Sequence, residues 1–166
     1  VAQHALQNSD GPLGIYRLEK RNAVAVIRPI AKNGAYRTWA SYGSSDRRSV
    51  SSRNGVLTAT RGLGNDLMSS EVGDLLRHVG QRREGVAAIE QRYLDGENQT
   101  VSIRSRCTIS RGGEERFTAG TGQTLRVTRM TARCQQDERT VMNNYLVTDN
   151  GTIVQSRHWA GPTMGY

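Results

Sequence analysis

Three alternating residues near the C-terminus carry the side chains best suited to hold a sugar. Gln155, Arg157 and Trp159 are spaced two apart, so a β-strand would place them on one face. An indole ring stacks on the C–H face of a sugar, while a guanidinium and an amide bond hydroxyls or a uronate carboxylate. The same string also fits a structural corner, with Trp159 closing the end of a barrel and 161–162 forming a turn. We favour this second interpretation.

Four other residues are candidates for ligand binding. Arg104 and Arg106 alternate with apolar residues and should face outward, where they would meet an anionic partner or simply be solvated. Trp39 and Tyr42 lie in a predicted hairpin on opposite faces, and Trp39 is better placed for the core than for a ligand.

No motif in the sequence indicates catalysis. The three histidines are isolated, and the sequence contains neither H-E-x-x-H nor G-x-S-x-G. The glycines of 62–67 lack the third glycine of a dinucleotide loop and the K-[ST] of a P-loop. We therefore predict no catalytic residue, metal or cofactor, although two carboxylates that meet only in space would escape this reasoning.

The charge predicts attraction to polyanions. The 166 residues carry a net charge of +8, and arginine supplies all the basic residues except Lys20 and Lys32. Nucleic acid, anionic lipid or an acidic polysaccharide would suit this charge, and an arginine-rich soluble surface would also explain it. Because no zinc finger, basic helix or ribonucleoprotein-type aromatic pattern is present, we predict no specific nucleic-acid binding.

Cys107 and Cys134 are the only cysteines, and neither lies in a C-x-x-C motif. They would pair in an oxidising compartment and remain buried thiols in a cytosol.

The elements that must position these residues are mostly strands. Hairpins are predicted at 23–42, at 48–60 around Asn54-Gly55, and at 141–159 around Asn150-Gly151. Further strands are expected at 86–94, 101–109 and 125–134, the last with a phase change that indicates a bulge or bend. Residues 110–122 look like a glycine-rich loop. One helix is predicted, with an apolar stripe over 72–79, a cap at Ser69 or Ser70 and an end at Gly80.

These elements predict a mainly β fold. We expect an antiparallel meander that forms a curved sheet or open barrel, with one short helix packed against it. Residues 1–13 are expected to form a flexible arm, and residues 14–166 a single β-rich domain.

Two segments resemble the YjbF/GfcB family of capsule and exopolysaccharide lipoproteins. The first is N-G-V-L-T-A-T-R-G-L-G-N-D-L at 54–67, where the family reads G-x-L-x-x-T-x-G-L and then D-L. The second is G-T-I-V-Q-S-R-H-W-A-G-P at 151–162, which follows N-Y-L-V at 144–147. It is the more specific match, because the family's closing hairpin reads S-R-Q-W-x-G-P. His158 stands where the family usually has Gln.

The resemblance implies a non-catalytic protein of a Gram-negative cell envelope. It would lie at the periplasmic face of the outer membrane, held by a lipid anchor of the precursor, and take part in assembly or export of an extracellular capsular polysaccharide. Its partners would be an acidic polysaccharide or other export proteins. The oxidising compartment would favour a disulfide between Cys107 and Cys134.

Two alternatives remain open. A periplasmic carrier or chaperone would hold a lipid or acyl chain in a half-open barrel, and would need an apolar cavity of about several hundred Å³. An enzyme acting on the polysaccharide would need a cleft with two carboxylates roughly 5–10 Å apart.

Overall fold

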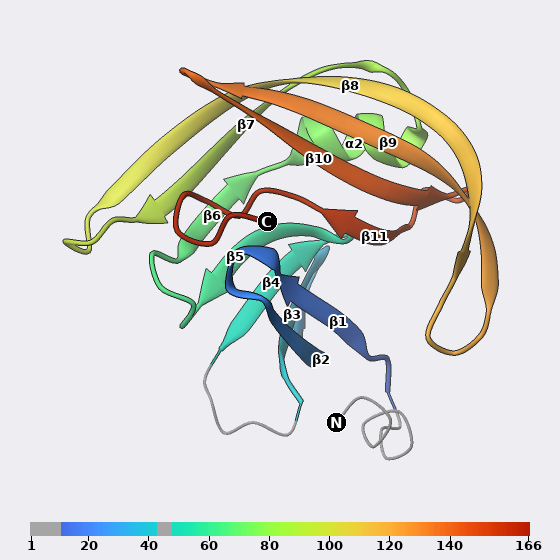
Figure 1. Cartoon of the computed structure of the whole chain (residues 1–166), viewed down its shortest axis with the longest axis horizontal. Coiled ribbons are helices and arrows are strands. Elements are labelled where there is room, and N and C mark those ends of the chain that lie inside the picture. The colour runs from blue at the N-terminus through green and yellow to red at the C-terminus, as the bar shows by residue number, and fades with distance from the viewer. Residues whose placement is uncertain (1–10, 43–47) are drawn as a thin grey trace.

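Two antiparallel sheets make up most of the computed structural model, which describes residues 11–42 and 48–166 (Figure 1). The first sheet contains β1 (Gly14–Leu18), β2 (Ala23–Asn33), β3 (Tyr36–Ser41), β4 (Ser49–Arg53) and β5 (Val56–Arg61). The second contains β6 (Leu67–Glu71), β7 (Gly85–Leu94), β8 (Thr100–Thr118), β9 (Thr124–Gln136), β10 (Arg139–Thr148) and β11 (Ile153–Arg157). A short 3-10 helix η1 (Glu19–Arg21) links β1 to β2, and α2 (Gly73–Gln81) links β6 to β7.

The predicted antiparallel meander is confirmed, because neighbouring strands in each sheet follow one another in the sequence. The strands are divided between two curled sheets, with the crossing between β5 and β6. Most of the predicted arm, residues 1–10, lies outside the described residues.

Tight turns set the register of the predicted hairpins. Asn54 and Gly55 both have positive φ, 43° and 79°, as a two-residue hairpin turn of the right twist requires. A Cβ at position 55 would also lie 3.0 Å from the Ile153 side chain. Glycine therefore allows both the turn and the close approach of the second sheet.

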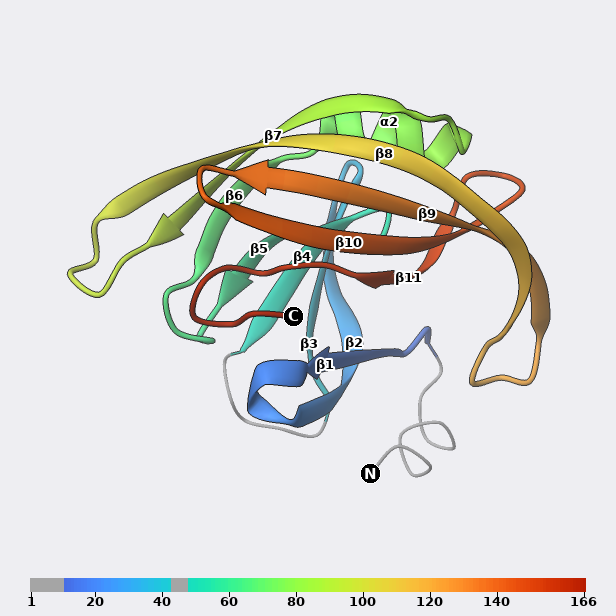
Figure 2. The same cartoon turned by 45° about the horizontal axis from the view of Figure 1, so that its top comes forward.

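The core lies between the sheets and around α2. In Figure 2, α2 lies alongside β7 and β8, and its Leu75 and Val79 are fully buried. The apolar stripe was predicted correctly, but the caps were not. Ser69 and Ser70 belong to β6 and pair with β7, so the helix begins after Val72, without a side-chain cap.

The predicted loop over 110–122 is wrong, because β8 continues to Thr118 as one arm of a long hairpin. Arg111 pairs with Met130 and Glu114 with Thr128, so two glycines oppose the single residue Arg129. This bulge in β8 lies beside the point where the buried face of β9 changes phase, at the consecutive buried residues Val127 and Thr128. A Cβ at Gly112 would lie 3.1 Å from the Arg129 carbonyl oxygen, so a larger residue there would push the two strands apart by a few tenths of an ångström.

Candidate functional site

The closing segment of the chain joins the two sheets. Ser156 Oγ donates a hydrogen bond to the Gly55 carbonyl oxygen at 2.6 Å, and Asn54 Nδ2 donates to the Gly151 carbonyl oxygen at 2.9 Å. Arg157 forms two parallel bonds to the Glu19 carboxylate, from Nε at 2.8 Å and from Nη2 at 2.7 Å. We call Glu19, residues 54–55 and residues 151–166 the sheet junction.

The guanidinium of Arg157 is occupied within the sheet junction. It stacks on the Tyr166 ring at 3.9 Å from the centroid, while its nitrogens bond Glu19. The Glu19 N–H also donates to the Tyr166 carbonyl oxygen at 2.7 Å. The hydrogen bonds from Arg157 lower the pKa of the Glu19 carboxyl, so this pair stays charged at neutral pH.

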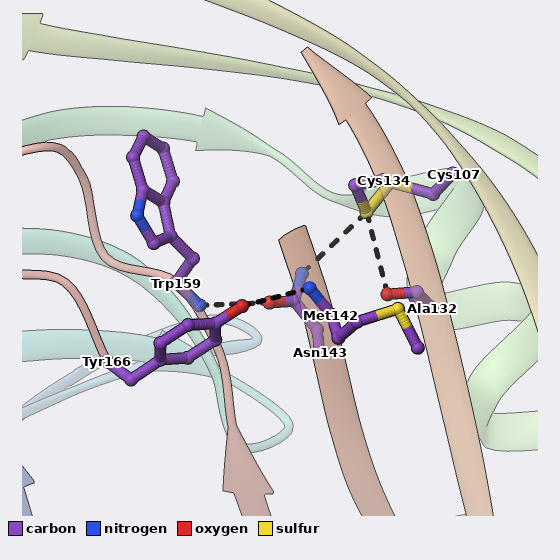
Figure 3. Close-up of a disulfide and its surroundings, with 7 residues drawn as sticks. All are labelled: Cys107, Ala132, Cys134, Met142, Asn143, Trp159 and Tyr166. Carbon is purple, nitrogen blue, oxygen red and sulfur yellow. Dashed lines mark hydrogen bonds between the residues drawn. A yellow bond between two sulfur atoms is a disulfide. The ribbon is translucent and has the colours of Figure 1, made fainter. Parts of the chain in front are cut away.

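Gln155, Arg157 and Trp159 do not share one exposed face. β11 ends at Arg157, and the chain then turns, so Trp159 enters the core with 7% of its surface exposed while Gln155 stays outside. The Trp159 indole meets the Tyr93 ring edge-on, with the ring centroids 6.3 Å apart. The Trp159 backbone N–H donates a hydrogen bond to Asn143 Oδ1 at 2.9 Å (Figure 3). This arrangement is the structural corner that the sequence also allowed.

Glycine makes the corner possible. Gly161 has φ of 118°, and a Cβ there would lie 2.6 Å from the Tyr93 ring. The following turn is closed by Ala160 N–H donating to the Gly165 carbonyl oxygen at 2.7 Å, and Lys20 Nζ donates to the Pro162 carbonyl oxygen at 3.0 Å.

A small cavity with both polar and apolar lining residues lies beside this corner, between the sheets. Its volume is about 20 Å³, room for one water-sized molecule. Ser70 Oγ, Ser105 Oγ and His158 Nδ1 border it, and none has a hydrogen-bond partner within the described chain. Burial lowers the pKa of His158 to about 4, so the imidazole is neutral at physiological pH.

The first segment of the resemblance, residues 54–67, also has a structural role. The Asp66 carboxylate accepts hydrogen bonds from Thr60 Oγ1 at 2.8 Å, Gly62 N–H at 2.8 Å and Leu63 N–H at 3.1 Å. Arg61 Nη1 donates to the carbonyl oxygens of Thr60 and Leu67, at 2.6 and 3.1 Å. Both ionic side chains thus order the loop that carries the chain from one sheet to the other.

Trp39 and Tyr42 are not brought together. Trp39 is half-buried, packs with the cluster of Leu18 and Val50, and donates from Nε1 to Ser52 Oγ at 3.3 Å. The Tyr42 N–H donates to the Val26 carbonyl oxygen at 2.7 Å, a pairing that places Tyr42 on the opposite face of the sheet from Trp39.

Arg104 and Arg106 lie on the outer face of the second sheet, as predicted. The Arg104 side chain is 82% exposed, with Nη2 3.7 Å from Glu90 Oε1. The Arg106 side chain has no ion-pair or hydrogen-bond partner in the part of the chain that the structure describes. Sequence reasoning missed Arg133, although it alternates with the buried Ala132 and Cys134. We call the following set the outer arginine face: Arg104, Arg106, Thr108, Arg133, Gln135 and Thr140.

The register brings these side chains together. Arg106 pairs with Gln135 and Thr108 with Arg133, so the two arginines are diagonal neighbours on one face. The Arg133 side chain also has no hydrogen-bond or ion-pair partner among the described residues. Thr140 Oγ1 donates to Gln135 Oε1 at 2.6 Å, which fixes the amide beside Arg106.

The predicted disulfide is present. Cys107 and Cys134 face each other in β8 and β9, and both are buried (Figure 3). Asn143 Nδ2 lies 3.7 Å from Cys134 Sγ, and Asn143 Oδ1 accepts from Trp159. The disulfide therefore lies next to the corner that Trp159 forms.

A larger hollow, of about 490 Å³, is open to solvent on the far part of the β8–β9 hairpin. It is lined by both signs of charge, including Glu114, Glu115, Arg116 and Arg126. Arg126 is already paired with Asp149 at 2.7 Å. The surface consequently has no net preference for an anion.

Neither a metal-binding cluster nor a membrane-spanning helix occurs among the described residues. No three His, Cys, Asp or Glu side chains there are grouped so that they could hold a metal ion. None of the helices there is long and apolar enough to cross a membrane.

Comparison with known proteins places the fold. The family described as "Group 4 capsule polysaccharide lipoprotein gfcB, YjbF" matches residues 1–166. The crystal structure of the hypothetical lipoprotein YmcC from Escherichia coli (K12) superposes with a TM-score of 0.82 at 19% identity, covering 99% of this chain and 84% of that chain. No curated protein matches the chain. The superposition shows that the two proteins share a fold.

Proposed function

The chain belongs to the YjbF family of group 4 capsule polysaccharide lipoproteins, and from this membership we propose that it binds an acidic glycan of the capsule through its outer arginine face. Family membership indicates a cell-envelope protein associated with capsule polysaccharide. The proposal adds a non-catalytic role in assembly or export of that polysaccharide at the periplasmic face of the outer membrane.

The availability of the arginines on the outer arginine face carries this proposal. Arg106 and Arg133 have no internal partner among the described residues, whereas the guanidinium of Arg157 is held by Glu19. A planar guanidinium matches a uronate carboxylate with two parallel hydrogen bonds. The neighbouring Thr108 and Gln135 add a hydroxyl and an amide that suit sugar hydroxyls, and the ladder of β8 and β9 fixes their spacing.

The size of the internal cavity favours a surface-binding protein over a lipid carrier. A carrier would enclose an acyl chain in about several hundred Å³ of apolar space. The cavity between the sheets has a volume of about 20 Å³, far too little for an acyl chain. A glycan on the outer face needs no such space.

Calorimetric titration tests the proposal. The chain would be titrated with an acidic bacterial exopolysaccharide rich in uronate, a neutral glucan and duplex DNA, each at low and near-physiological salt. We expect the acidic glycan to bind at both salt concentrations. The double variant Arg106→Gln/Arg133→Gln should weaken this binding about tenfold, because each lost charged hydrogen bond at an exposed site contributes a modest amount.

A matched control separates the site from the net charge. Arg83→Gln/Arg116→Gln removes the same charge from exposed arginines outside the outer arginine face. Equal weakening by both double variants, or equal binding of DNA and glycan that vanishes as salt rises, would reduce the interaction to general polyanion attraction. Release of reducing ends from the polysaccharide would instead revive the enzyme hypothesis.

A further inference from the structure

We propose that the outer face of the first sheet, at β1 and β2, docks on an anionic lipid bilayer. The most exposed β-branched apolar side chains there are those of Ile15, which is 72% exposed, and Val24, which is 58% exposed. Both belong to the hairpin that opens the first sheet. Burying apolar side chains of this size against another apolar surface is favourable.

Strand register places these residues on one face together with arginine. Ile15 pairs with Val26, and Arg17 pairs with Val24, so all four side chains point to the same side of the sheet. Arg28 follows on that side of β2. We call these five residues the lipid face.

Tyr42 lies next to the lipid face. Its N–H donates to the Val26 carbonyl oxygen, a pairing that puts Tyr42 on the same side of the sheet. A phenol is apolar along its ring and polar at its tip, which suits the boundary between headgroups and acyl chains.

The surrounding charge complements anionic headgroups. Arg17 and Arg28 lie on the lipid face, and residues 14–33 as a whole contain five basic side chains and a single acid, Glu19. The carboxylate of Glu19 is bonded to Arg157, so it does not offset the basic residues nearby. Basic groups beside exposed apolar groups fit an anionic bilayer, because a soluble polyanion would contact the charge alone.

The position of the lipid face agrees with a protein held at a membrane. The family description is of lipoproteins, whose anchor brings the folded domain to a bilayer surface. In Figures 1 and 2, β1 and β2 lie at the bottom of the molecule and β8 and β9 at the top. Docking through the lipid face would therefore leave β8 and β9 open to solvent.

Vesicle sedimentation of the unlipidated chain tests the docking. Vesicles of phosphatidylcholine containing about one-third phosphatidylglycerol should bind the chain, and vesicles of phosphatidylcholine alone should bind it far less. Arg17→Gln/Arg28→Gln should lower the partition about tenfold or more, since each basic residue near the surface contributes about fivefold. Ile15→Ser/Val24→Ser should lower it by a similar factor, because apolar contact is lost.

Matched controls make the test specific. Val86→Ser/Val101→Ser removes two exposed valines of the second sheet, and Arg83→Gln/Arg116→Gln removes two arginines elsewhere. Both should leave the partition within about twofold of the unaltered chain. A tryptophan placed by Ile15→Trp should shift its emission to the blue and be quenched by brominated lipid only when anionic vesicles are present.

Three results would overturn the proposal. One is no binding to anionic vesicles. Another is binding lost with Arg106→Gln/Arg133→Gln and kept with the lipid-face variants, which would place the membrane at the other sheet. The third is a dimer in solution that Ile15→Ser/Val24→Ser dissociates without changing vesicle binding, which would assign the lipid face to a second copy of the chain.

Discussion

The sheet junction and the outer arginine face both contain arginine, but they use it differently. In the sheet junction, Arg157 is held by two hydrogen bonds to Glu19 and by the ring of Tyr166. On the outer arginine face, Arg106 and Arg133 are held by no side chain in the described part of the chain. A guanidinium with satisfied bonds stabilises the fold, whereas one that is bonded only to water is available to a ligand.

This difference shows what kind of information an unusual sequence motif carries about the protein. The strings that carry the family resemblance lie in the sheet junction and in the crossing loop ordered by Asp66, where they fix how two sheets meet. The outer arginine face is made of ordinary residues in simple alternation. The specific string therefore identifies the architecture, and the proposed binding surface has to be found from register and from unpartnered charge.

Truncating Trp159 tests the structural side of the comparison most strongly. Trp159→Ala should lower the free energy of unfolding by about 3–5 kcal/mol, because it empties a buried aromatic site. Urea denaturation would measure the loss, and the acidic-glycan affinity of the folded protein should stay unchanged. Unaltered stability together with lost glycan binding would restore Trp159 as a ligand platform.

Removing the disulfide should have the next largest effect. Cys107 and Cys134 are separated by 27 residues, so Cys107→Ala/Cys134→Ala should lower the free energy of unfolding by about 3 kcal/mol. Chemical denaturation with and without a reductant would measure this effect. The unaltered protein should weaken on reduction while the double variant does not respond. An unaltered protein that is insensitive to reductant would show that the pair contributes nothing to the stability of the core.

The sequence predicted the elements with strong local patterns. Asn54-Gly55 and Asn150-Gly151 specify hairpin turns whatever surrounds them, and the apolar stripe of α2 has the helical period. The prediction failed where pairing between strands decides the structure. Ser69 and Ser70 are good capping residues, yet they pair with β7 and so belong to β6. Gly112 and Gly113 look like a loop, yet pairing with β9 makes them a bulge.

The candidate residues show the same limit. Alternation correctly placed Arg104 and Arg106 outward, because strand period alone decides that. Alternation also grouped Trp159 with Arg157, but β11 ends at Arg157, and no local signal in the sequence marks that end. Arg133 was missed because only the register of β8 against β9 shows that it is a neighbour of Arg106.

Acid should weaken the sheet junction through His158. Its folded pKa, about 4, lies below the value of roughly 6.5 expected in the unfolded chain. The unfolded state therefore binds more protons between these values, and stability falls as pH drops from about 6.5 to 4. The loss should reach about 2 kcal/mol, a figure reduced for the part of His158 that meets solvent.

His158→Gln isolates this effect, because glutamine keeps a polar side chain but does not titrate. Thermal denaturation from pH 8 to pH 4 should show a flatter stability profile for the variant than for the unaltered protein. The pKa of Glu19 is lowered in the folded protein, so its contribution to stability is lost only as pH falls below its unfolded pKa of about 4.5. Glu19 therefore contributes little to the change in stability between about pH 6.5 and pH 4.5. Parallel profiles for the two proteins would show that the imidazole is solvated in the folded state.

The smallest expected effect is the difference in stability between variants of single arginines from the two regions. Arg157→Gln should lower the free energy of unfolding by about 1 kcal/mol, because its side chain and that of Glu19 are each more than 40% exposed and such pairs are weak. Arg106→Gln, with no partner to lose, should change stability by less than about 0.5 kcal/mol. Glycan affinity should respond in the opposite order, weakening for Arg106→Gln and not for Arg157→Gln. Denaturation with Glu19→Gln as the second mutation would complete a double-mutant cycle for the ion pair. Equal stability losses for the two arginines would mean that the contact between the sheets does not depend on the Arg157–Glu19 pair. Packing around Trp159 and the hydrogen bonds at Gly55 would then be what holds the two sheets together.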